Sequence, residues 1–156
     1  MKVTQLNHAV LWVSDPEASA DFYKRTFGFE VVDSRPGMAV FMRAANSGNH
    51  HDLAVMRGRG GPLPQGSVGL YHLAWEVGTI EELAEAEKSL AEAGALRGMS
   101  DHRVSKSLYG ADPDGIEFEI MWRVPREAWG EYERKATTMP LDLNRELARW
   151  GSKAAV

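Results

Sequence analysis

The sequence predicts an α+β protein made of two tandem β-α-β-β-β modules followed by a C-terminal helical tail. Three observations predict this fold class. Two Leu-x-His motifs, ending at His8 and His72, open two alternating runs, and Val13 and Val77 follow at the same offset. A helical pattern and three further strand patterns follow each run. The segment Gly58–Gly66 is rich in Gly and Pro and separates the two halves as a linker.

The first module is expected within residues 1–58. Alternating apolar residues predict the first strand, and Pro in the first turn after Ser14-Asp15 predicts a helix start. A glycine at position 28 is typical of a helix C-terminus. The expected elements are a strand over Val3–Val13, a helix from Pro16 to Gly28, and strands over Glu30–Asp33, Met38–Arg43 and Asp52–Arg57.

The second module is expected within residues 68–122. Leu83, Ala86 and Leu90 follow helical spacing, and Gly94 ends that helix. The Asp-Pro-Asp-Gly sequence at 112–115 is typical of a hairpin turn. The expected elements are a strand over Gly69–Val77, a helix over Ile80–Ala93, and strands over Leu96–Met99, Ser105–Ala111 and Ile116–Trp122. The two modules together predict an eight-stranded sheet with helices on its outer face and a cleft on its inner face.

Residues 123–156 do not continue the repeat. Arg126–Lys135 and Leu141–Trp150 have helical patterns, and Asp142 is placed to cap the second helix. We therefore expect residues 1–122 to form one domain of two modules, and residues 123–156 to form a helical extension packed on the sheet.

The composition narrows the classes of function. The 156 residues include 44% hydrophobic residues, which is ordinary for a globular core, and the net charge of −4 argues against a nucleic-acid partner. No apolar run is long enough to span a bilayer, and no basic-then-apolar leader is found, so we expect a cytoplasmic protein with no membrane partner. Cysteine is absent, so any transition metal must be held by His and carboxylate side chains.

Such side chains stand on compatible strand faces. The apolar face of each first strand is expected to pack on its helix, which leaves His8 and His72 facing the cleft. Glu119 alternates with buried apolar residues on the last strand, and Glu117 shares its face and is an alternative ligand. Two His and one carboxylate with open positions are the facial triad of non-haem Fe(II) oxygenases. The sequence therefore predicts a divalent metal site at His8, His72 and Glu119.

These motifs resemble the vicinal oxygen chelate superfamily, which includes glyoxalase I, fosfomycin-resistance thioltransferases, bleomycin-binding proteins and type I extradiol dioxygenases. The resemblance covers residues 3–122 and rests on the paired modules, the two Leu-x-His motifs and the Asp-Pro-Asp-Gly-x-x-x-Glu hairpin. It implies an eight-stranded half-open barrel. In that superfamily the metal ligands lie on the first strand of each module and the last strand of the second, at positions matching His8, His72 and Glu119.

Further motifs are similar to those of catechol 2,3-dioxygenase-like extradiol enzymes. His51, in the sequence His-His-Asp-Leu-Ala, matches the histidine that acts as acid and base, although His50 is the adjacent alternative. The segment 101–109 resembles the stretch that carries an outer histidine and an active-site tyrosine, here His102 and Tyr109. The match departs at Arg103 and Lys106, where many relatives have Gly and His.

The resemblance implies an Fe(II)-dependent dioxygenase that cleaves a catechol-like aromatic diol with O₂. His51 would accept and return protons, Tyr109 would hydrogen-bond the bound diol, and His102 would do the same or orient Tyr109. The same ligands accept Mn(II) or another divalent metal. Dimerisation is common in the fold, so we expect a homo-oligomer.

Two alternatives use the same fold. One is an oxygen-independent metal enzyme: a glyoxalase, an epimerase or a thioltransferase, for which Arg103 and Lys106 would offer cations to a phosphonate. A glyoxalase needs a further carboxylate near Ala54, where Asp52 is the only candidate. The other alternative is a non-catalytic drug-binding resistance protein, which needs no metal ligands.

Overall fold

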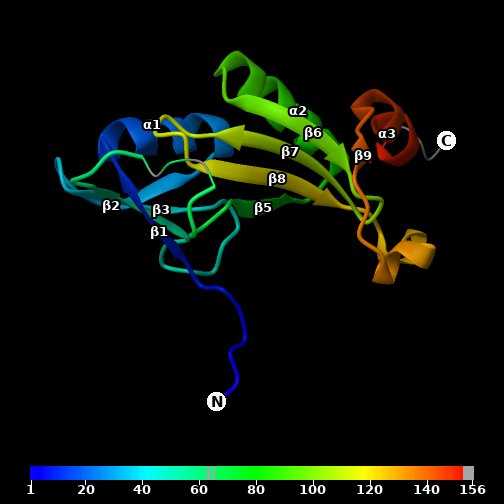
Figure 1. Cartoon of the computed structure of the whole chain (residues 1–156), viewed down its shortest axis with the longest axis horizontal. Helices are drawn as coiled ribbons and strands as arrows, with labels where there is room; N and C mark the ends of the chain where they lie inside the picture. The colour runs from blue at the N-terminus through cyan, green and yellow to red at the C-terminus, as the bar shows by residue number, and fades with distance from the viewer. Residues whose placement is uncertain (63, 65, 153–156) are drawn as a thin grey trace. The chain divides into compact units, whose positions relative to one another are not determined.

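A computed structural model describes residues 1–62, 64 and 66–152 and has the predicted α+β architecture (Figure 1). The chain divides into two compact units. The first comprises Met1–Ser67 with Pro113–Gly115, and the second comprises Val68–Asp112 with the described residues from Ile116 onward. The predicted domain boundaries at 58, 68 and 122 stay predictions, and positions 63 and 65 of the expected linker lie outside the described residues.

The first unit contains one helix and a four-stranded sheet in the order β1-β4-β3-β2. β1 pairs with β4 in parallel, and the other pairs are antiparallel. The helix packs against β2, β3 and β4. Its elements are β1 (Ala9–Val13), α1 (Pro16–Phe27), β2 (Glu30–Arg35), β3 (Ala39–Arg43) and β4 (Leu53–Arg57).

The second unit repeats this plan and adds to it. Its sheet has the order β5-β8-β7-β6-β9, and β5 pairs with β8 in parallel. Its elements are β5 (Leu73–Val77), α2 (Ile80–Glu92), β6 (Leu96–Asp101), β7 (Ser105–Ala111), β8 (Glu117–Arg123), the 3₁₀ helices η1 (Arg126–Ala128) and η2 (Gly130–Arg134), β9 (Met139–Pro140) and α3 (Leu143–Trp150). The two predicted β-α-β-β-β modules and the C-terminal helix are confirmed.

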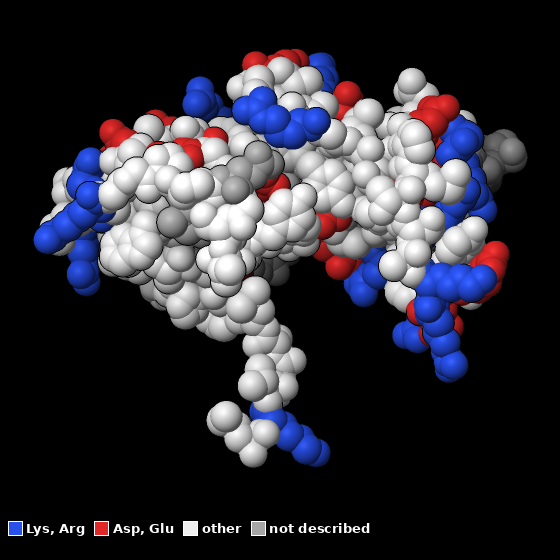
Figure 2. Space-filling model, viewed as in Figure 1, with Lys and Arg blue, Asp and Glu red and all other residues white. Residues whose placement is uncertain are grey.

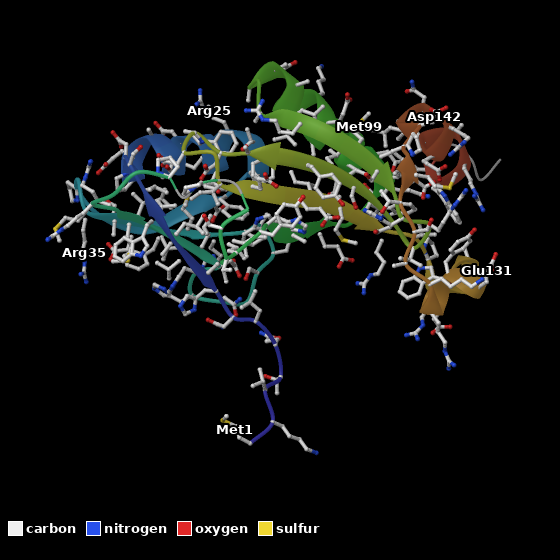
Figure 3. The ribbon with its side chains drawn as sticks, in the orientation of Figure 1. Met1, Arg25, Arg35, Met99, Glu131 and Asp142 are labelled. Carbon is white, nitrogen blue, oxygen red and sulfur yellow. The ribbon has the colours of Figure 1, made fainter. Side chains whose placement is uncertain are left out.

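Local sequence explains where the helices begin and end. The Asp15 carboxylate accepts the backbone N–H groups of Glu17 and Ala18 at the start of α1, and Gly28 ends that helix at φ +67°. Thr79 and Glu82 form a reciprocal capping box at the start of α2. The predicted cap of the last helix is confirmed, because Asp142 accepts the backbone N–H of Arg145 (Figure 3).

The expected alternation of the first strand is present. Leu11 and Val13 are buried, whereas Val10 and Trp12 are 48% and 69% exposed. The two sets therefore lie on opposite faces of the first sheet, one buried and one exposed. His8 is the residue directly before this strand, and it is exposed.

Both first strands are shorter than predicted. The predictions began them at Val3 and Gly69, but β1 begins at Ala9 and β5 at Leu73. The reason is pairing: β4 offers partners to β1 only from Leu53 onward. The preceding residues alternate in sequence but have no strand beside them, and residues 1–8 extend away from β1 as an exposed arm (Figure 1).

The C-terminal extension also differs from its prediction. Arg126–Lys135 was predicted to be helical, but it forms two short 3₁₀ helices, and β9 was not predicted. On the face drawn in Figure 2, basic and acidic side chains lie side by side over this segment. Two ion pairs, Arg126–Glu133 and Lys135–Glu131, belong to this segment. Neither 3₁₀ helix has a buried residue, so no apolar face holds this segment in a longer packed helix.

A buried ion cluster fastens α3 to the second sheet. Lys106 Nζ lies 2.6 Å from Asp101 Oδ1 and 3.4 Å from Glu146 Oε2. The side chains of Lys106 and Asp101 are only 3% and 1% exposed. Buried charges are tolerated when they are paired and hydrogen-bonded, and here the Trp150 indole N–H also donates to Glu146.

Residue sizes differ between the two sheets at one matching strand pair. In the second sheet Gly110 stands opposite Phe118, and in the first sheet Met42 stands opposite Leu53. A methyl group on Gly110 would lie 2.5 Å from the Phe118 ring. Because Gly110 has no side chain, the ring of Phe118 fits beside it on the neighbouring strand.

Among the described residues no helix is long and apolar enough to cross a membrane.

Candidate metal and catalytic site

In the second unit the structure brings together two of the three predicted metal ligands. His72 directly precedes β5, and Glu119 lies on β8 opposite Ala74 of β5. His72 Nε2 lies 3.1 Å from Glu119 Oε2, and the side chains are 24% and 13% exposed. Because β5 and β8 run in parallel, the end of one strand is held beside the middle of the other. The alternative ligand, Glu117, lies two residues earlier, opposite Ala111.

The predicted tyrosine and outer histidine lie beside this pair. Tyr109 stands on β7 directly opposite Glu119, and its hydroxyl oxygen lies 3.5 Å from Glu119 Oε1. His102 Nε2 lies closer to that hydroxyl, at 2.7 Å. Burial and the negative charge of Glu119 raise the pKa of Tyr109 above its ordinary value. Tyr109 therefore keeps its proton at neutral pH and retains a hydroxyl for hydrogen bonding.

The first unit holds the remaining histidines. The rings of His8 and His51 have centroids 4.6 Å apart, and the ring of Phe41 lies edge-on to His51 at 5.3 Å. His50 is exposed, and its Nδ1 lies 3.1 Å from His51 Nδ1. Of the two adjacent histidines, His51 is the one packed against His8, and which of them faces a metal stays a prediction.

Asp52 shapes the loop that carries these histidines. Its carboxylate accepts the backbone N–H of Ala44 at 2.8 Å, the Ser47 hydroxyl at 2.8 Å and the Asn49 amide at 2.7 Å. Both carboxylate oxygens are therefore used within the loop. Asn49 also donates to the backbone oxygen of Asn7, which ties the loop to the residues before β1.

The pKa of His51 is lowered from its ordinary value. Burial of the ring contributes most, followed by the nearby imidazoles of His8 and His50. The lowered pKa favours the neutral form of His51, and a neutral imidazole has one ring nitrogen that can accept a proton.

Strand register identifies the counterparts of the second-unit residues in the first unit. Ala54 stands opposite Val10 as Glu119 stands opposite Ala74. Phe41 stands opposite Ala54 as Tyr109 stands opposite Glu119. The first unit thus carries an alanine at the carboxylate position and a phenylalanine at the tyrosine position. At Ala54 the first unit therefore lacks the additional carboxylate that the glyoxalase alternative needs.

No three His, Cys, Asp or Glu side chains are grouped to hold a metal among the described residues. His8 belongs to the first unit, whereas His72 and Glu119 belong to the second, so the complete triad stays a prediction. The donor atoms that do meet, an imidazole nitrogen and a carboxylate oxygen at 3.1 Å, are of the kinds that hold Fe(II) and Mn(II). This donor set fits a His–carboxylate metal site.

One proposed cation does not belong to the site. Lys106 was considered as a phosphonate-binding residue, but it is buried in the ion cluster with Asp101 and Glu146. Lys106 is three residues before Tyr109 on β7. Because side chains alternate along a strand, the two side chains point to opposite faces of the sheet. Arg103 lies at the turn between β6 and β7, where its guanidinium contacts Asp101 and Met139.

One contact of the site was not predicted. His102 Nδ1 lies 2.8 Å from the backbone oxygen of Thr137, in the segment before β9. A backbone carbonyl has no signature in the sequence, and a two-residue strand has no periodicity, so nothing in the pattern could have indicated this partner.

Comparison with known proteins places the chain in a family. A family model described as the Glyoxalase/Bleomycin resistance protein/Dioxygenase superfamily matches residues 5–120, and the chain belongs to this superfamily. The catechol-2,3-dioxygenase of Bacillus subtilis (strain 168) is 32% identical over 149 residues, covering 89% of this chain and 50% of that protein. The biphenyl-2,3-diol 1,2-dioxygenase 3 of Rhodococcus globerulus is 33% identical over 125 residues, covering 77% of this chain and 64% of that protein. The chain thus spans half to just under two thirds of these relatives.

Solved structures support the fold. A glyoxylase/bleomycin resistance protein/dioxygenase domain from Frankia sp. EAN1pec has a TM-score of 0.65 at 24% identity, covering 79% of this chain and all of that one. The fosfomycin resistance protein FosX of Listeria monocytogenes has a TM-score of 0.63 at 20% identity, covering 81% of this chain and 99% of that one. At these identities the likenesses establish the shared fold alone.

Proposed function

We propose that the chain is an extradiol dioxygenase that cleaves a catechol-like aromatic diol with O₂ and depends on Fe(II). The observation that carries the proposal is the connected set in the second unit, in which His72, Glu119, Tyr109 and His102 follow one another at 3.1, 3.5 and 2.7 Å. Relatives named as dioxygenases of catechol and biphenyl-2,3-diol support the same reaction class. One relative, in Rhodococcus jostii (strain RHA1), is named an iron-dependent extradiol dioxygenase.

His8, His72 and Glu119 would hold the metal. When bound, Fe(II) supplies a redox-active Lewis acid with positions open to the two oxygens of a diol and to O₂. Glu119 contributes one negative charge, and His72 is positioned against it by the parallel pairing of β5 and β8. Mn(II) fits the same donor atoms.

His51 would move the protons. A diol that binds through both oxygens gives up a proton, and a base close to neutrality is suited to accept it. The pKa of His51 is lowered by burial and by its imidazole neighbours, which favours the neutral ring that can accept a proton. Phe41 and His8 hold the ring from two sides.

Tyr109 and His102 would orient the diol. The raised pKa of Tyr109 keeps its hydroxyl protonated, so it can bridge two partners by hydrogen bonds. His102 lies 2.7 Å from that hydroxyl and limits its rotation. The side chain is half-buried on β7, a rigid strand between two others, which suits a positioning role.

The structure weakens the oxygen-independent alternatives. A thioltransferase acting on a phosphonate needs free cations, whereas Lys106 is buried and paired. A glyoxalase needs the carboxylate that Ala54 lacks, and Asp52 is used by its own loop. A drug-binding protein needs no paired His and Glu.

The test is oxygen consumption by Fe(II)-loaded protein with catechol, 3-methylcatechol and biphenyl-2,3-diol, read together with the yellow ring-cleavage product. We expect uptake and colour with at least one diol. The Glu119→Gln variant should lose both, and Glu117→Gln, on the same strand face, should keep both. Full metal loading with no uptake on the panel would contradict the proposal and favour oxygen-independent chemistry.

A further inference from the structure

The C-terminal extension reaches the site of the second unit through β9. β9 pairs antiparallel with β6, with Pro140 opposite Ser100 and Met139 opposite Asp101. This pairing places residues 137–140, here called the C-terminal strap, along the end of β6. The backbone oxygen of Thr137 then lies 2.8 Å from Nδ1 of His102, the residue that follows β6.

The strap contact determines which nitrogen of His102 carries a proton. A carbonyl oxygen only accepts hydrogen bonds, so Nδ1 of His102 must be the donor to Thr137. In the neutral ring Nε2 is then an acceptor, and the partner at 2.7 Å, the Tyr109 hydroxyl, must donate to it. The single proton of Tyr109 is committed to His102, because the distance to Glu119 is longer at 3.5 Å.

Arg103 ties the turn after β6 to the strap. Its guanidinium lies 2.9 Å from the Met139 sulfur and 5.8 Å from the centre of the Tyr132 ring. Its backbone has a φ of +68°, a conformation that costs a residue with a side chain about 1 kcal/mol. The Asp101 carboxylate accepts the Arg103 backbone N–H at 2.7 Å and holds this turn in place. A strained backbone that is fixed from several sides is typical of a positioning element.

We propose that the C-terminal strap is a positioning element of the active site, which holds His102 in the Nδ1–H form so that Tyr109 presents its oxygen lone pairs to the bound diol. Tyr109 then accepts a hydrogen bond from a diol hydroxyl while it donates to His102. The contacts with Thr137 and Tyr109 are the basis for the Nδ1–H form of His102, and the contacts of Arg103 are the basis for its role in holding the strap. Their effect on turnover rests on the proposed function.

The tautomer is measured directly by ¹⁵N NMR of the histidine rings, with the His102 signals assigned by their loss in His102→Gln. We expect His102 to be Nδ1-protonated in the full chain. The test variant is Arg103→Gly, because glycine adopts a positive φ without strain, and the change removes the side-chain contacts to Met139 of the strap, to Tyr132 and to Asp101. In this variant we expect Nε2-protonated ring to appear. Arg126→Ala, which removes an exposed ion pair with Glu133 outside the strap, is the control and should leave the signals unchanged.

Kinetics then separate positioning from simple stability. We expect Arg103→Gly to lower kcat about tenfold with metal content and KM for the diol nearly unchanged, the size found for partners that orient site residues. In the His102→Gln background the same change should have no further effect on kcat. A wild-type His102 protonated at Nε2, or an additive loss of kcat in the double variant, would overturn the proposal. A correct tautomer without oxygen uptake would refute the dioxygenase function and leave the strap contact established.

Discussion

The two units are built on one plan but carry different chemistry at matching positions. Each begins with a histidine directly before its first strand, His8 in one and His72 in the other. The last strand then carries Ala54 in the first unit and Glu119 in the second. The neighbouring strand carries Phe41 in the first and Tyr109 in the second. The repeat therefore preserves backbone position and one histidine while the remaining polar groups occur in only one copy.

This difference shows that a repeated fold can carry different side chains at matching positions of its two copies. In the second unit His72 lies 3.1 Å from the Glu119 carboxylate, and an imidazole beside a carboxylate suits the binding of a cation. In the first unit the histidines are packed against each other and against Phe41, and burial favours the neutral form of His51. We infer that the second unit supplies most of the metal-binding charge and the first supplies the proton acceptor.

The largest expected effect concerns stability of the second unit. Lys106→Met removes the cation between the buried carboxylates of Asp101 and Glu146, and breaking such a pair costs about 3–5 kcal/mol. Urea unfolding measures this loss. The control is Arg123→Met, which removes an exposed ion pair with Glu76 and should cost less than about 1 kcal/mol. Equal losses in the two variants would mean that the cluster does not stabilise the second unit.

The next effect concerns metal binding. Glu119→Ala, His72→Ala and His8→Ala should each reduce the affinity for Fe(II) or Mn(II) at least about 100-fold, beyond the range typical of outer partners. Metal content after dialysis checks this, with Glu117→Ala as the matched control on β8. If only the His8 variant keeps its metal, the second unit binds the metal without the first, and the triad is wrong.

A smaller effect concerns the tyrosine and its counterpart. Tyr109→Phe should lower kcat/KM by up to about tenfold, because it removes the hydrogen bond of about 0.5–1.5 kcal/mol that the tyrosine oxygen accepts from a diol hydroxyl. Phe41→Tyr places a hydroxyl at the matching position of the first unit. It should not restore activity in the Tyr109→Phe background, since Ala54 gives it no carboxylate neighbour. Restoration would show that the two positions are equivalent.

The last effect concerns acid stability of the first unit. Burial would raise the pKa of Asp52, but hydrogen bonds from Asn49, Ala44 and Ser47 outweigh it and lower the pKa below the ordinary value of 3.8. The stabilisation is therefore present above pH 3.8 and is lost as the pH falls through the folded-state pKa. Asp52→Asn should cost about 1–2 kcal/mol at pH 7 and less at lower pH. Unfolding midpoints at pH 7 and pH 3 measure this, and a constant difference would contradict it.

Much of the fold was predictable because its signals are local and periodic. The strand alternation placed Leu11 and Val13 inward, and the caps at Asp15 and Asp142 were recognisable from their residue types. The first strand was predicted to start too early, because the alternation in the sequence begins several residues before Ala9, the first residue of β1 that pairs with β4. Short 3₁₀ helices and β9 have too few residues to show a period.

The candidate site was predictable only where the repeat or the resemblance supplied a position. His72 and Glu119 do meet, as do His102 and Tyr109. The burial of Lys106 was not predictable, because its partner Glu146 lies on a helix forty residues later in the chain. The Thr137 contact depends on a backbone atom, which any residue carries.

The pairing of Gly110 with Phe118 limits the exchange of strands between the two copies. The matching pair in the first sheet, Met42 with Leu53, consists of two residues of similar size, whereas the pair in the second sheet joins the smallest residue to a large ring. Placing β8 opposite β3 would set Phe118 against Met42, and placing β4 opposite β7 would set Leu53 against Gly110 and leave space unfilled. Each of these four positions therefore accepts a substitution only as far as its own partner allows, whatever residue stands at the matching position of the other copy.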